Sequence, residues 1–121
     1  MLIALWIVNG LLALAMLGAG GMKLATPKTA LAEKGMTWTE DFSAGAVKAI
    51  AGLEVLGAIG LILPKLTGIA AILTPIAGVG LAIIMLGAVV VHVRRGEPTA
   101  PAVVLTVLAI ASAVLGFIVV V

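Results

Sequence analysis

Hydrophobic positions fill the chain in long runs that charged residues interrupt at only a few places. A helix needs ~20 apolar residues to cross a hydrocarbon core of roughly 30 Å. Period-two alternation is absent from the runs, which argues against a membrane β-barrel and favours helices that satisfy their own backbone groups. The pattern therefore predicts membrane-spanning helices over about residues 2–22, 43–63, 66–91 and 100–121.

A polar segment separates the first two predicted spans. Thr26 and Pro27 are residues that begin helices, and Gly35 is a residue that ends them. A short helix at the membrane surface is expected between them. The predicted fold is thus all-α: one domain, residues 1–121, forming a polytopic membrane four-helix bundle with a short interfacial helix in the first loop.

Composition removes several classes of function. Hydrophobic side chains make up 64% of the chain and charged ones 10%, which excludes an ordinary soluble domain. With no cysteine and one histidine, the chain alone cannot form a dithiol, an iron–sulfur ligand set, a thiolate zinc site or a bis-histidine haem site. We therefore predict no metal site and no cofactor. The net charge of +2 comes mostly from helix ends, so no nucleic-acid partner is expected.

Positive charges are distributed unequally between the two ends of the predicted bundle. Only Lys65 lies in the second loop, whereas the first and third loops carry most of the others. The positive-inside rule places the first and third loops in the cytoplasm and both termini outside. The basic residues of those two loops are Lys23, Lys28, Lys34, Arg94 and Arg95.

Glu54 is the most informative residue, because it lies inside an apolar span. At ~1.5 Å per residue it is about 15 Å from the start of its helix, near the bilayer midplane. An acidic side chain at that depth costs roughly 2.5–3.5 kcal/mol on insertion scales, so it requires a partner, water or a proton. Lys48 is six residues away, a rotation of about 240°, so the partner must come from another helix. Glu54 either ties helices together or serves a ligand or a reaction.

Other polar residues form two predicted layers. Asn9 and Ser112 fall roughly 18–20 Å from the end that carries the first and third loops, close to the level of Glu54. A basic layer nearer the membrane surface is formed by Lys23, Lys48, His92 and Arg94. The candidate ligand-binding residues are Asn9, Lys23, Lys48, Glu54 and Ser112, and the candidate catalytic residues are Glu54 and His92. Each has a structural alternative: helix contacts for Asn9 and Ser112, an extended side chain reaching the interface for Lys23, and titration at a helix end for His92.

Three segments resemble the DoxX-like family of small bacterial membrane proteins: GGMKL at residues 20–24, GLEVLGAIGLILP at 52–64 and GAVVVHVRRGE at 87–97. The resemblance covers nearly the whole chain. It implies a four-helix bundle in the bacterial inner membrane, with Lys23, Glu54 and His92 at the family's recurring polar positions. Members are associated with thiosulfate:quinone oxidoreductase, with membrane redox complexes of actinobacteria and, more distantly, with a receptor-assembly chaperone and sterol isomerase-like bundles.

Three hypotheses of function follow. The first is a protein that binds an apolar isoprenoid- or quinone-like molecule beside Glu54, or an accessory subunit that docks on a membrane partner or on a second copy of itself. The second is an enzyme in which Glu54 donates a proton to a lipid alkene or epoxide, assisted by His92. The third is a purely structural subunit of a membrane assembly, which depends on close helix contacts at Ala109, Ala113 and Gly116.

Overall fold

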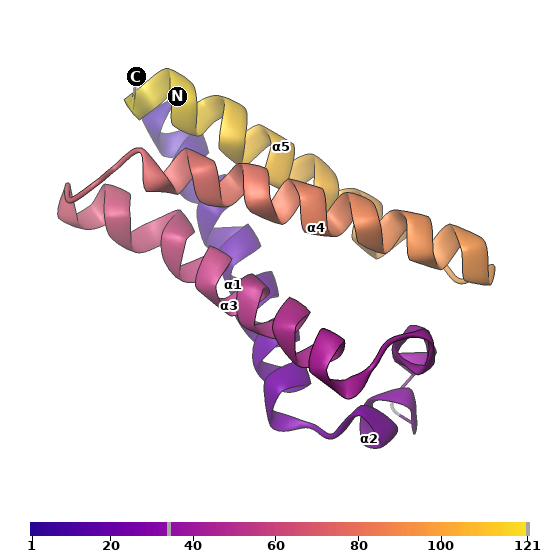
Figure 1. Ribbon diagram of the computed structural model, residues 1–121. Coiled ribbons are helices and arrows are strands. Elements are labelled where there is room, and N and C mark those ends of the chain that lie inside the picture. The colour runs from indigo at the N-terminus through magenta and orange to yellow at the C-terminus, as the bar shows by residue number, and fades with distance from the viewer. Residues whose placement is uncertain (34, 121) are drawn as a thin grey trace.

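The chain forms a bundle of long helices with a short helical segment at one end (Figure 1). The computed structural model describes residues 1–33 and 35–120, so Lys34 and Val121 of the predictions lie outside the described residues. Four helices of the described chain are long and apolar enough to cross a membrane, and no strand occurs in it, which confirms the predicted fold class. The elements are α1 (Leu2–Ala25), α2 (Lys28–Glu33), the 3-10 helix η1 (Thr37–Asp41), α3 (Ala44–Thr67), α4 (Leu73–Arg95) and α5 (Ala100–Val120).

The long helices are arranged as two pairs, α1 with α3 and α4 with α5. The pairs converge at the end that carries both termini and the α3–α4 connection (Figure 1). They spread apart toward the opposite end, where η1 approaches α4 near the α4–α5 connection and α2 packs against η1. This divergence matters for function because it places η1 over the space between the pairs.

The interior and the surface of the bundle are both apolar. Leu12, Met16, Leu61 and Leu81 are buried in a core to which all four long helices contribute, α5 through Ala109. Large hydrophobic side chains also cover the outside, as in Ile3, which is 77% exposed. In water such a surface would aggregate, whereas lipid chains cover it at little cost.

α3 ends later than the sequence predicted. The predicted span ends at residue 63, directly before Pro64, but the helix continues to Thr67. Proline removes one amide donor and disturbs the helix hydrogen-bond ladder around it. Here other residues supply partners: the Lys65 amide donates to Thr74 Oγ1 over 3.1 Å, and the Leu61 carbonyl accepts from Asn9 Nδ2 over 2.9 Å. These tertiary hydrogen bonds are the reason that the helix continues past Pro64.

α4 begins seven residues later than predicted, at Leu73 rather than at residue 66. The preceding connection starts at Gly68, whose φ of 73° ends α3 in the left-handed conformation. Pro75 therefore lies in the first turn of α4, where a missing amide costs little. A proline well inside a helix would kink it, whereas Pro75 at this position has no full preceding turn of helix to distort.

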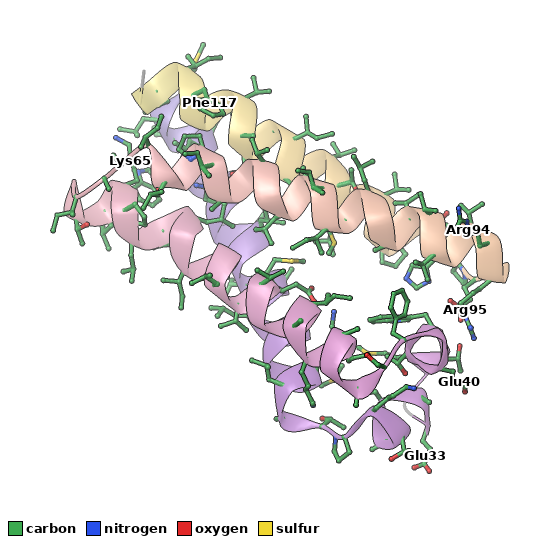
Figure 2. All side chains as sticks on the ribbon, in the orientation of Figure 1. Glu33, Glu40, Lys65, Arg94, Arg95 and Phe117 are labelled. Carbon is green, nitrogen blue, oxygen red and sulfur yellow. The ribbon has the colours of Figure 1, made fainter. Side chains whose placement is uncertain are left out.

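Charged residues separate along the bundle as the charge pattern predicted (Figure 2). Arg94 and Arg95 lie at the spread end, on the same side of the molecule as Glu33 and Glu40 of the first loop. Lys65 lies at the converging end. The first and third loops thus share one end of the bundle, and their cytoplasmic location stays a prediction.

Candidate functional site

The buried carboxylate of Glu54 forms an ion pair with Lys23. Oε1 of Glu54 accepts from Nζ of Lys23, and the two side chains are 1% and 9% exposed. Lys23 lies on α1 and Glu54 on α3, so the partner comes from another helix, as the sequence predicted. Helical side chains lean toward the N-terminus of their own helix. Because α1 and α3 run in opposite directions, Lys23 leans toward the membrane interior and Glu54 toward the loops, and the two charges meet.

Gly20 allows the helices to approach closely beside this pair. A Cβ at this position would lie 2.9 Å from the carbonyl oxygen of Ala51 and 3.2 Å from Cβ of Glu54. Glycine therefore sets the α1–α3 separation at the level where Lys23 and Glu54 have to meet. The neighbouring Gly21 has open space around it, so close helix packing requires glycine at position 20 but not at position 21.

Lys48 has a structural role at the end of α1. Its ammonium group donates to the carbonyl of Lys23, to that of Leu24 over 3.1 Å and to that of Thr26 over 2.5 Å. These carbonyls belong to the last turn of a helix and to the residue after it, where a positive charge also complements the helix dipole. Lys48 thus anchors α3 to the end of α1, and its predicted ligand-binding role finds no support in these contacts.

A cavity of about 440 Å³ lies between the α1–α3 and α4–α5 helices, and Lys23 and Glu54 are among the residues that line it. Trp38 and Phe42, at and just after η1, line one side of it, in edge-to-face contact with ring centroids 5.7 Å apart. Nζ of Lys23 lies 5.4 Å from the ring centroid of Trp38, within cation–π range. The remaining lining residues are mostly apolar and come from all four long helices: Met16, Ala19, Ile50, Ile83, Ile84, Met85, Gly87, Ala88, Val91, His92, Pro101, Ala102 and Leu105.

His92 lines the same cavity and belongs to a polar cluster at its outer edge. Nδ1 of His92 lies 3.0 Å from Oε1 of Glu97, and Nε of Arg95 lies 3.3 Å from Oε2. Thr37 Oγ1 donates to Oε2 of Glu97 over 2.5 Å, which joins η1 to the α4–α5 connection. The Thr37 hydrogen bond, followed by those from His92 and Arg95, holds the pKa of Glu97 below its usual value near 4.5.

The lowered pKa of Glu97 predicts an acid-sensitive attachment of η1. The folded-state pKa lies below the unfolded one, so Glu97 contributes stability above about pH 4.5, and the contribution is lost as pH falls through the folded value. In a Trp6→Phe background, quenching of Trp38 fluorescence by acrylamide should rise below pH 4.5. Glu97→Gln should show raised quenching already at pH 7 and no further rise in acid.

Glu40→Gln is the matched control, because Glu40 is an exposed carboxylate on the same short helix. It should behave as the wild-type protein does across the titration. A wild-type Trp38 signal that is unchanged down to pH 3, or a Glu97→Gln variant with wild-type quenching, would contradict a role of Glu97 in holding η1.

Asn9 and Ser112 form a separate polar cluster away from the cavity. Ser112 Oγ donates to Asn9 Oδ1 over 2.5 Å, and Asn9 Nδ2 donates to the carbonyl of Leu61. All three groups are buried, and they connect α1, α3 and α5. Neither Asn9 nor Ser112 is among the residues that line the cavity. Their contacts match the structural alternative, in which they bind helices together.

The structure therefore brings three of the predicted site residues to one cavity: Lys23, Glu54 and His92. The candidate residues predicted from the sequence did not include Thr37, Trp38 or Glu97. The available signal for Trp38 was its place in the first loop, but its position over Lys23 depends on how that loop folds back.

The fold and these contacts define a small polytopic integral membrane protein with a buried ion pair beneath a largely apolar cavity. The chain belongs to the DoxX-like family, whose family model matches residues 7–114. No curated protein and no solved structure is significantly similar to it.

Proposed function

We propose that this membrane protein binds an isoprenoid- or quinone-like molecule in the cavity, with the polar group of the ligand at the Lys23–Glu54 pair. The observation that carries the proposal is the cavity itself, about 440 Å³ with a mostly apolar lining that includes one buried charge pair. Small-molecule sites typically enclose roughly 300–1,000 Å³ with a few convergent polar groups. An ammonium offers donors and a carboxylate offers acceptors, so a carbonyl or hydroxyl head group suits the pair.

The aromatic side of the cavity favours a planar ligand. Trp38 and Phe42 present ring surfaces next to Lys23, and offset or edge-to-face contacts with a flat ring are favourable. We place the protein in the bacterial inner membrane, with η1 and the cavity entrance on the cytoplasmic side. As an accessory subunit it would then present the ligand to a membrane partner or to a second copy of the chain.

Ligand retention during purification tests this function. Wild-type protein extracted in a mild detergent should carry a small apolar molecule that native mass spectrometry detects. Ala88 lines the cavity, so Ala88→Leu should fill part of it and lower the retained fraction about tenfold, the effect of ~1.4 kcal/mol. Glu54→Ala should lower it as well.

Ala4→Leu is the control for the added side chain, because Ala4 is exposed on α1 and does not line the cavity. It should retain the ligand at the wild-type level. A wild-type protein that carries no molecule, or equal retention in Ala88→Leu and Ala4→Leu, would overturn the proposal.

The acid–base alternative rests on the shared cavity of Glu54 and His92. The contacts of the described residues assign these side chains to different partners, Glu54 to Lys23 and His92 to Glu97. Catalysis by Glu54 would require its carboxyl group to leave Lys23 before it could deliver a proton to an alkene or epoxide. The structure thus supports binding more directly than catalysis, and the catalytic role stays a prediction.

A further inference from the structure

A second hollow lies between α3 of one helix pair and α4 of the other, and nothing in the proposed site accounts for it. It is a groove of about 600 Å³ along the seam between the two helices. On α3 its lining runs from Leu53 to Thr67, a length of roughly 21 Å at ~1.5 Å per residue. The groove therefore extends from the level of Glu54 toward the converging end of the bundle.

The floor of the groove is made of small residues. Gly57 and Gly60 of α3 face Leu81 and Ala77 of α4, so close that a Cβ on either glycine would lie within 2.9 Å of the facing side chain. Gly80 also lines the groove, and open space surrounds the position of its missing Cβ. The helices thus meet at the bottom of the groove and leave a trough above it that the side chains of the protein do not fill.

The lining of the groove is hydrocarbon. Its hydroxyl-bearing residue, Thr67, lies at the far end and donates to the carbonyl of Leu63 in its own helix over 2.8 Å. Large exposed side chains such as Leu56 and Ile76 form the walls. A head group would find no partner here, whereas a linear hydrocarbon chain would find contacts along the whole length.

The groove and the cavity have one lining residue in common. Ile84 of α4 lines both, and the neighbouring lining residues on α3 are Leu53 in the groove and Glu54 in the cavity. A molecule with its polar group at Glu54 would therefore leave the cavity beside Ile84 and enter the groove directly.

We infer that the groove holds the hydrocarbon tail of the ligand whose head occupies the cavity, so the ligand class is a head group on a long linear chain, such as a polyprenyl quinone. This inference rests on the proposed function and specifies its ligand. The tail runs along the α3–α4 seam from Ile84 toward Thr67, within the hydrocarbon core of the membrane. A ligand with the same head group and a short tail occupies the cavity alone and does not make these contacts.

The test compares two ubiquinone analogues with the same head, one with a single isoprenoid unit and one with four, whose extended tail is about as long as the groove. The chain has two tryptophans, so Trp6→Phe leaves Trp38, beside the cavity, as the sole reporter of quenching by a quinone head. In nanodiscs, with ligand expressed per lipid, the protein should bind the long-tailed analogue more tightly. The gain in affinity should be about fivefold. It is modest because the tail moves from lipid into an equally apolar groove, so only better packing favours the bound state.

Gly80→Leu should abolish this preference and leave short-tailed binding unchanged, since the new side chain enters the groove and not the cavity. Gly52→Leu is the control: Gly52 lies on α3 in open space and lines neither hollow. Retained binding of the short analogue shows that each variant is folded. As a second measurement, a diazirine at the end of the long tail should cross-link to α3 after Gly60 or to the first half of α4.

The outcomes distinguish failure of the proposed ligand binding from failure of the tail assignment. If neither analogue quenches Trp38, the proposed quinone-like ligand is wrong, and the tail assignment fails with it. If both bind but Gly80→Leu keeps the wild-type preference, or if the diazirine labels α1 and α5 instead, head binding stands and the groove assignment is overturned.

Discussion

Replacing either member of the Lys23–Glu54 pair with methionine is expected to lower the free energy of unfolding by about 3–5 kcal/mol, the range found when one partner of a buried ion pair is removed. Both side chains are almost fully buried, so the charge that remains has neither water nor a counter-ion. The apolar cavity beside it supplies little compensation. Equilibrium unfolding in mixed micelles, followed by tryptophan fluorescence, measures the loss for Lys23→Met and for Glu54→Met.

The double variant tests whether Lys23 and Glu54 stabilise the protein as a pair. Two apolar side chains of similar volume often replace a buried ion pair at little cost, so Lys23→Met with Glu54→Met should recover most of the lost stability. Lys28→Met, on the interfacial helix α2, controls for the loss of a lysine and should change stability by less than about 0.5 kcal/mol. A double variant as unstable as the sum of the single variants would show that the two side chains do not act as a pair.

The double variant also separates folding from function. If the pair exists only to hold α1 against α3, the refolded double variant should retain ligand as the wild-type protein does. If the pair receives the head group of the ligand, the double variant should be stable and empty. The proposed function requires the second result, because two methionines offer neither an ammonium donor nor a carboxylate acceptor.

The sequence was sufficient to predict the membrane class, the four helices and the need of Glu54 for a partner on another helix. It did not identify Lys23 as that partner, because counting residues from the loops gives the depth of backbone atoms. Lys23 was placed near the surface and Glu54 near the midplane. The count ignored the opposite lean of side chains on antiparallel helices, which brings the two groups together.

The cluster at the edge of the cavity was beyond sequence reasoning for another reason. Thr37 and Glu97 are 60 residues apart, and each belongs to a polar connection without helical periodicity. The hydrogen bond between them forms only because the two loops lie at the same end of the bundle. The positive-inside rule placed them on one side of the membrane, but it gives no information on contacts between them.

The late end of α3 shows the same limit at the level of a single residue. Local rules predict a stop at Pro64, and they are correct for a proline whose neighbours have no other partners. Thr74 and Asn9 supply those partners from α4 and α1. The helix boundary is therefore a tertiary property, and the predicted start of α4 was displaced with it.

Close packing of α4 on α5 at Gly78 leads to the second large effect. A Cβ at this position would lie 2.9 Å from the amide nitrogen of Ala113, 3.1 Å from its Cα and 3.1 Å from Oγ of Ser112. Two of these atoms belong to a helix backbone, which cannot move aside as a flexible side chain can. Gly78→Ala should therefore separate the helices and cost about 3 kcal/mol, the upper part of the usual range for overpacking.

Gly80→Ala provides the matched comparison, since Gly80 lies two residues further along α4 with open space around it. Both substitutions reduce the backbone freedom of the unfolded chain equally, and both favour helix by up to about 1 kcal/mol. The stability difference between them therefore isolates the contact with α5. Adding Ala113→Gly should not rescue Gly78→Ala, because the clash is with the backbone of residue 113 and not with its methyl group. Equal stability of the two alanine variants, or rescue by Ala113→Gly, would mean that α4 and α5 are further apart than the structure places them.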